Sequence, residues 1–147
     1  MRRYTPTIVV VAALLSAACS PASDPPAPAG PKTTTIAIPY GDLLNHHNVT
    51  RDVALAVGDT LQISLGTNTS TGYRWNPDLQ ISDTAVLVQA GHEVITPAGS
   101  PPGAPGSEVW ALQALGRGAA IVRGSYGRPW AGGEKDAWTF TAQVTVN

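Results

Sequence analysis

The alternation of apolar and polar residues in the last segment of the chain is the feature that most constrains its fold. From Trp138 to Val146 every second residue is apolar, and each residue in between is Thr or Gln. Leu61 to Leu65 repeats the pattern with Gln and Ser in the polar positions. Side chains on a strand point alternately to its two faces, so a period of two predicts strands with one buried and one solvated face.

Further short segments from residue 33 onward are rich in β-branched and aromatic residues, and a helical period is hard to find there. Turn-forming residues separate these segments, as at Gly58-Asp59. Many short strands with no crossover helix between them predict an all-β fold, an antiparallel β-sandwich. Beside the two segments above, the expected strands are residues 34–38, 49–57, 73–75, 86–90, 93–95, 108–115 and 119–126.

The segment 96–107 is rich in proline and glycine, a composition that a linker between two domains would share. The residues that follow it are too few to hold a hydrophobic core of their own. We therefore expect a long loop within one domain that covers residues 33–147. Long loops in compact domains are usually functional or mobile.

Residues 1–18 have the composition of a secretory signal peptide. Two arginines precede an apolar run at 8–15, and small residues then lead to Cys19. The run is shorter than the ~20 residues that a membrane-spanning helix needs. The sequence LSAAC at 15–19 resembles the lipobox of bacterial lipoproteins, in which the cysteine becomes the lipidated N-terminus. The alternative is an ordinary signal peptide in which Cys19 has no role.

The lipobox resemblance implies an exported protein of the bacterial cell envelope, anchored to the membrane through lipid on Cys19. The multiple acyl chains expected on such a cysteine would hold the protein firmly. Residues 19–32 would form a tether, because the stretch is rich in proline and has almost no large apolar residue. Proline favours an extended polyproline II chain, which at ~3.1 Å per residue would reach roughly 40 Å.

Composition argues against several classes of function. With a net charge of −1 and only 13% charged residues, the chain lacks the positive charge that attracts nucleic acid. A single cysteine can form neither an internal disulfide nor a zinc cluster of thiolates, and we expect no metal and no cofactor. The adjacent His46 and His47 are expected in an exposed polar turn, and no G-x-S-x-G nucleophile motif is present. We therefore do not expect an enzyme.

Three short segments outside the strand pattern carry the candidate binding residues. The first is a small polar turn with a glycine, the second ends the long loop, and the third places a tryptophan beside proline and arginine. From the first turn alone an ordinary connection is the simpler interpretation. The tryptophan of the third segment is either a loop tip tucked into the core or an exposed anchor, and exposed Trp and Arg side by side are typical of interface hot spots. The residues are Asn68, Thr69, Ser70, Thr71, Gly72 and Tyr73, then Gly103 and Gly106, then Arg128, Pro129 and Trp130.

In this order the three segments resemble the chagasin family of proteinaceous inhibitors of papain-like cysteine peptidases. The family's hallmarks are N-P-[ST]-T-G-[YF], G-x-G-G and R-P-[WF], on three loops of an immunoglobulin-like β-sandwich. Here they stand as NTSTGY, GAPG and RPW. Thr69 replaces the family's proline, which makes the first loop less rigid, and Pro105 replaces a glycine, which removes an N–H group.

The resemblance implies a monomeric, reversible and competitive inhibitor whose three loops enter the active-site cleft of a papain-like cysteine peptidase. The first loop would lie nearest the catalytic residues, with Thr71 offering a hydroxyl and backbone groups. Trp130 would lie on an apolar wall of the cleft with Arg128 nearby, and residues 103–106 would contact the opposite side. The alternative is an envelope-anchored immunoglobulin-like binding lipoprotein that does not inhibit proteases.

Overall fold

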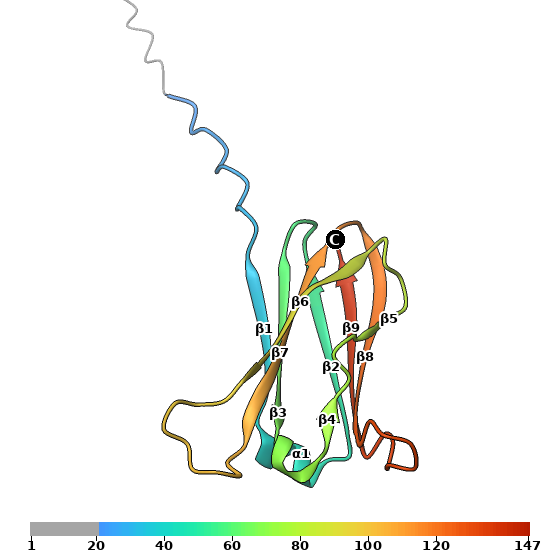
Figure 1. Ribbon diagram of the computed structural model, residues 1–147. Coiled ribbons are helices and arrows are strands. Elements are labelled where there is room, and N and C mark those ends of the chain that lie inside the picture. Colours follow the sequence, from blue (N-terminus) through green and yellow to red (C-terminus); the bar gives the residue numbers. More distant parts are fainter. Residues whose placement is uncertain (1–20) are drawn as a thin grey trace, which may run out of the picture.

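Two β-sheets packed face to face around one hydrophobic core form the body of the chain (Figure 1). The computed structural model describes residues 21–147. The expected signal peptide and Cys19 lie outside the described residues. Residues 21–32 are exposed and contain neither helix nor strand. None of the helices within residues 21–147 combines the length and apolar character needed to cross a membrane.

The first sheet has the strand order β1 (Thr33–Ile38), β3 (Thr60–Thr67), β7 (Gly106–Ala114) and β6 (Leu87–Ile95). β3, β7 and β6 pair antiparallel, whereas β1 lies parallel to β3 at the edge. β6 joins two of the expected segments into one strand, with a shift in register between Gln89 and Gly91.

The second sheet has the order β2 (Asn48–Leu55), β9 (Trp138–Val146), β8 (Gly118–Gly127) and β4 (Arg74–Trp75), and β5 (Gln80–Ile81) also pairs with β8. β2 lies parallel to β9, and the other pairs are antiparallel. The predicted all-β, immunoglobulin-like sandwich is thus confirmed, with one parallel pair at an edge of each sheet.

The sequence pattern did not predict three short elements. These are α1 (Tyr40–Asn45), the 3₁₀ turn η1 (Thr69–Thr71) and β5. The six-residue α1 is too short to show a helical period, but it buries Leu43 completely in the core. It packs closely on β3, where a side chain at Gly66 would collide with the backbone of Tyr40.

The core lies between the inward faces of the two sheets, as the alternation predicts. Leu61, Ile63 and Leu65 of β3 are fully buried, and so is Phe140 of β9. Trp110 of β7 is also fully buried. Burial of large side chains from both sheets fixes the relative position of the strands, and with it the position of the loops that join them.

Strand register brings three loops to one end of the sandwich. The loop 68–73 joins β3 to β4, the loop 96–105 joins β6 to β7, and the loop 128–137 joins β8 to β9 (Figure 1). We call this the loop end. The chain enters β1 at the opposite end, where Thr33 pairs with Thr60, and the C-terminus lies there too. The exposed segment 21–32 and the three loops therefore leave opposite ends of the domain.

Candidate functional site

The loop 68–73 is held by its own hydrogen bonds. The Asn68 Oδ1 atom accepts from the backbone N of Ser70 at 3.2 Å and from its hydroxyl at 2.6 Å. The backbone N of Gly72 donates to the carbonyl of Thr69 at 3.2 Å, which closes the turn. These bonds stabilise the backbone around Thr69, the position at which the chagasin motif has proline.

The hydroxyl of Thr71 also acts inside the loop. It donates to the Asn68 carbonyl at 2.6 Å and accepts from the backbone N of Tyr73 at 3.3 Å. The family resemblance implied that this hydroxyl is offered to a partner, but its proton is already donated to the Asn68 carbonyl. Thr71 is exposed, so its methyl group and the loop backbone remain accessible.

Gly72 and Trp130 join the first loop to the third. Gly72 has a φ of +81°, a left-handed conformation that favours glycine. A Cβ atom at this position would lie 2.7 Å from Cη2 of the Trp130 ring, so the indole rests directly on Gly72. The ring is nevertheless 51% exposed. Trp130 therefore packs on the first loop with part of its ring and leaves the rest open to solvent.

The loop 128–137 is folded back on itself. The backbone N of Arg128 donates to the Glu134 carbonyl at 2.7 Å. The Lys135 ammonium donates to the carbonyls of Arg128 at 2.5 Å and of Trp130 at 2.8 Å. The Arg128 guanidinium lies over the Tyr73 ring, 4.6 Å from its centroid, in a cation–π contact that adds a second link to the first loop.

Stacked aromatic rings support these two loops from below. Tyr126 stacks on Trp138 at a centroid distance of 4.8 Å and on Tyr73 at 5.7 Å. The backbone N of Asn68 donates to the Tyr126 hydroxyl at 3.1 Å. The Tyr73 hydroxyl donates to the Glu134 carboxylate. That hydrogen bond raises the pKa of the Tyr73 phenol, and burial adds to the rise.

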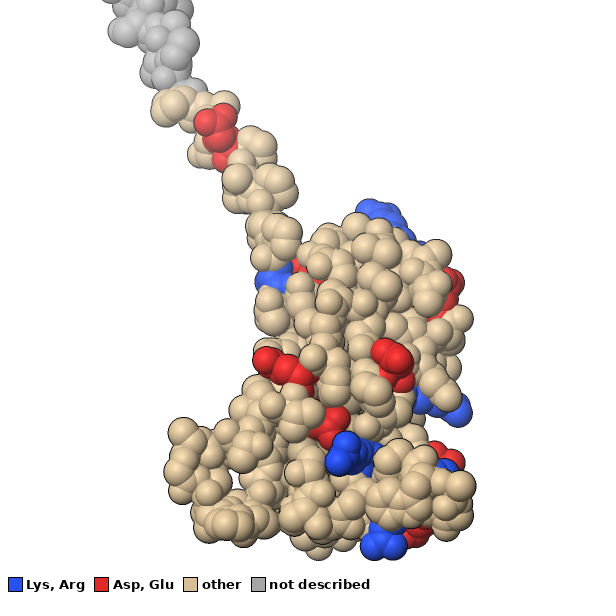
Figure 2. All heavy atoms as spheres, viewed as in Figure 1, with Lys and Arg blue, Asp and Glu red and all other residues tan. Residues whose placement is uncertain are grey.

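The second loop is tied to the first by one side-chain bond. Asn68 Nδ2 donates to the Gly103 carbonyl at 3.1 Å, and Gly103 has a φ of +83°. Gly106 is the first residue of β7, not part of the exposed loop, and a Cβ atom there would collide with the Ile95 carbonyl. The loop projects away from the body and has no charged residue (Figure 2).

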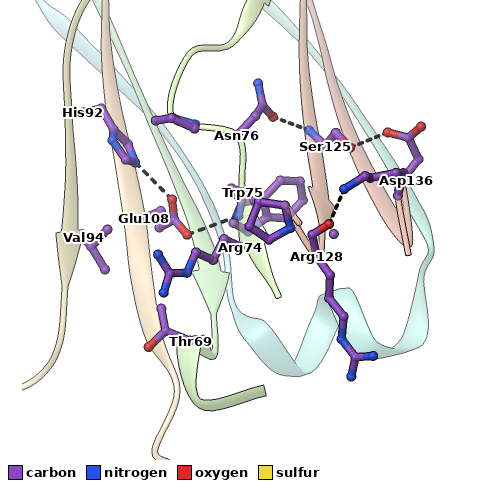
Figure 3. Close-up of a pocket in the computed structure, with 14 residues that line it drawn as sticks. Thr69, Arg74, Trp75, Asn76, His92, Val94, Glu108, Ser125, Arg128 and Asp136 are labelled. Carbon is purple, nitrogen blue, oxygen red and sulfur yellow. Dashed lines mark hydrogen bonds and ion pairs between the residues drawn. The ribbon is translucent and has the colours of Figure 1, made fainter. Parts of the chain in front are cut away.

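Beside the first and third loops, a hollow of about 470 Å³ opens between β4, β6 and β8 (Figure 3). Its wall includes Trp75, Val94 and Pro129 together with the charged groups of Arg74 and Lys135. The carboxylate of Glu108 also reaches it. No cluster of His, Cys, Asp and Glu that could hold a metal ion occurs within residues 21–147.

Several residues that support the loop end were not predicted from the sequence. The roles of Glu134 and Tyr126 depend on contacts across the fold. The role of Lys135 depends on how its own loop folds back, so none of the three carries a local signal in the sequence. Glu108 did carry one. It falls on the same face of β7 as Trp110 and Leu112, so the strand pattern places a carboxylate among core residues. In the structure Glu108 is buried, with 2% exposure. His46 and His47 are exposed at the end of α1.

The chain is similar to a known protein family and to several solved structures. Residues 54–144 match the model of the chagasin family of peptidase inhibitors, I42. No curated protein matches the chain. Among solved structures, the cysteine protease inhibitor EhICP2 from Entamoeba histolytica is 24% identical, with a TM-score of 0.55 over 69% of this chain and 94% of that one. The inhibitor PbICP-C, solved in complex with falcipain-2, is 20% identical, with a TM-score of 0.55 over 79% of this chain and 99% of that one.

Proposed function

The chain belongs to the chagasin family of peptidase inhibitors, and we propose that it inhibits papain-like cysteine peptidases by inserting its three loops into the active-site cleft. Members of this family are protease inhibitors, so the chain is an inhibitor and not an enzyme. The similar fold of two cysteine peptidase inhibitors, one of them in complex with falcipain-2, supports a cysteine peptidase as the partner.

The observation that carries the proposal is the set of contacts between the loops. Asn68 bonds to Gly103 of the second loop, Gly72 lies against Trp130, and Tyr73 bonds to Glu134 and lies under Arg128. Loops that are ordered before binding lose less conformational entropy in the complex, which leaves more of the contact energy as affinity. A surface held in this way is suited to entering a preformed cleft.

Each loop would then have a separate role. The first would lie nearest the catalytic Cys and His of the peptidase and present backbone groups near Thr71 and Gly72. The exposed part of the Trp130 ring would cover an apolar wall, and the loop 96–105 would contact the opposite side. Inhibition is competitive and reversible, because no carbonyl of the loop has to be presented to the thiolate in attack geometry. About 800 Å² per partner would be buried.

The position of the segment 21–32 supports the accompanying proposal of a lipid anchor on Cys19. This segment leaves the end of the sandwich opposite to the loops (Figure 1). A protein tethered to a membrane through this segment can turn its loop end toward the surroundings. The proposed location is therefore the bacterial cell envelope, with the inhibitory loops facing away from the membrane.

A titration of papain with residues 20–147 tests the function, with a fluorogenic peptide as substrate and a serine protease as control. All strands within the described residues lie between Thr33 and Val146, so this soluble piece contains the whole sandwich. We expect submicromolar, competitive and reversible inhibition of papain alone. Absence of inhibition of papain and of a cathepsin-like peptidase at tens of micromolar would instead favour the binding lipoprotein without inhibitory activity.

Variants then test the loops. We expect Trp130→Ala and Thr71→Ala each to weaken inhibition by about 1 kcal/mol or more. Thr71→Ser keeps the hydroxyl that bonds to Asn68 and should retain most of the affinity. Leu115→Ala removes a side chain of similar exposure at the opposite end of the sandwich, and should leave inhibition unchanged. If both alanine variants inhibit papain as strongly as the wild-type protein, the first and third loops do not contribute to binding as proposed.

A further inference from the structure

The carboxylate of Glu108 is buried beneath the root of the first loop. Its side chain points inward from β7 and is 2% exposed. Burial of a carboxylate among core residues is costly unless several donors bond to it. Its partners therefore indicate why a charged group stands at this position of a core strand.

One oxygen of this carboxylate contacts both ends of the first loop. Glu108 Oε1 accepts from the Thr67 hydroxyl at 3.2 Å and from the backbone N of Trp75 at 3.3 Å. Thr67 is the last residue of β3, and Trp75 is the last residue of β4. Because β3 and β4 belong to different sheets, this single atom joins the two sheets where the loop crosses between them.

The other oxygen is fixed from the neighbouring strand. His92 Nε2 on β6 lies 3.0 Å from Glu108 Oε2, and Figure 3 shows the carboxylate between His92 and Trp75. The His92 ring in turn stacks on Trp110, with 5.0 Å between the ring centroids. The carboxylate is thus held by β6 on one side while it holds the loop root on the other.

We infer that Glu108 is a positioning residue that sets the distance and orientation between the two ends of the first loop, and so its inhibitory conformation. The inference rests on the proposed function, in which this loop lies nearest the catalytic residues of the peptidase. Glu108 touches no part of the proposed interface itself. Without it, the loop would have to be ordered by the peptidase during binding, and affinity would fall.

The test compares variants of the purified full-length protein in two assays: inhibition of papain, and backbone amide hydrogen exchange in residues 68–75. We expect Glu108→Ala to weaken inhibition about tenfold or more and to accelerate exchange in this segment. Glu108→Gln keeps an acceptor oxygen for Thr67 and Trp75, and should stay within about threefold of wild type. Thr67→Val removes one bond with little change of shape and should weaken inhibition by about three- to tenfold.

A matched control separates positioning from loss of stability. Val146→Ala truncates a buried side chain of β9 at the opposite end of the sandwich. It should lower the melting temperature and leave both papain inhibition and exchange in residues 68–75 unchanged. If Glu108→Ala fails to fold, Thr67→Val and Glu108→Gln decide the question.

Three results would overturn the inference. The first is an unchanged rate of amide hydrogen exchange in residues 68–75 of folded Glu108→Ala and Thr67→Val. The second is an exchange rate that rises evenly over both sheets. The third is a Glu108→Gln variant that inhibits papain as weakly as Glu108→Ala does. If the wild-type protein does not inhibit papain, the proposed function fails in this assay. The exchange measurement then still decides whether Glu108 holds the loop, so the two failures are distinguishable.

Discussion

At the scale of single residues, Gly72 does two things that no other residue could do at its position. Its φ of +81° costs a residue with a side chain about 1–2 kcal/mol. Its missing side chain leaves the space in which the Trp130 indole lies. The contact between the exposed Trp130 ring and the first loop therefore depends on the absence of a Cβ atom at Gly72.

Gly72→Ala should weaken inhibition more than its effect on stability explains, because the new Cβ would displace the Trp130 ring. Gly132→Ala is the matched control. Gly132 has a similar φ of +74°, but a Cβ there meets no atom within 4 Å. Both variants should lose about 1–2 kcal/mol of unfolding free energy, measured by urea denaturation. Equal inhibition constants for the two would show that the contact with Trp130 does not matter.

The raised pKa of Tyr73 predicts that the protein loses stability at alkaline pH. Its pKa is raised in the folded state above the ordinary value of 10.0, first by the bond to Glu134. The folded protein therefore binds the phenolic proton more tightly than the unfolded chain, and this contribution is present below about pH 10 and lost above it. Tyr73→Phe should flatten the fall of melting temperature as the pH rises above about 10. Burial also raises the pKa of Tyr40, so Tyr40→Phe is measured beside it. An identical pH profile in Tyr73→Phe would contradict the assignment.

At the scale of elements, the first loop shows how hydrogen bonds can replace a rigid residue. Asn68 adopts an extended backbone with φ of −135° and ψ of 92°, and Thr69 is the first residue of η1. An extended residue is what a following proline requires, and proline is well suited to the first position of a helical turn. The backbone of this loop has thus kept the conformation into which the family's proline would fit.

Thr69→Pro should therefore strengthen inhibition, since it reduces the freedom of the unbound loop without distorting it. Substitutions of this kind typically contribute about 0.4–1 kcal/mol to stability. We expect a two- to fivefold lower inhibition constant and a higher melting temperature. Ser70→Pro, at a residue whose backbone N bonds to Asn68, is the control that should weaken both. A Thr69→Pro variant weaker than wild type would show that the loop has a conformation of its own.

At the scale of the whole molecule, the sequence predicts the strands well and the contacts between loops poorly. The period of two identified β3 and β9, because one face of each packs on the core. It could not indicate that β1 and β2 pair parallel at the sheet edges, since register and direction depend on partners distant in the chain. The three motifs located the candidate loops. The supporting groups Glu134 and Tyr126 act across the fold, and Lys135 acts through the folded-back shape of its own loop. Glu108 occupies an inward position of β7, a signal that the sequence analysis did not use.

The opposite placement of the loops and the segment 21–32 leads to a prediction about the proposed lipid-anchored form of the protein. Cys19→Ser should move the protein from the detergent phase to the aqueous phase in a phase-partition experiment, because it removes the proposed site of lipid attachment. The same variant should inhibit papain as strongly as the wild-type protein in liposomes, since the segment 21–32 leaves the end of the sandwich opposite to the loops (Figure 1). Deletion of residues 21–31 from the anchored protein should lower the inhibition, because the domain would then lie closer to the lipid surface. A Cys19→Ser protein that stayed in the detergent phase would argue for the ordinary signal peptide, and equal inhibition with and without residues 21–31 would show that the tether's length has no role.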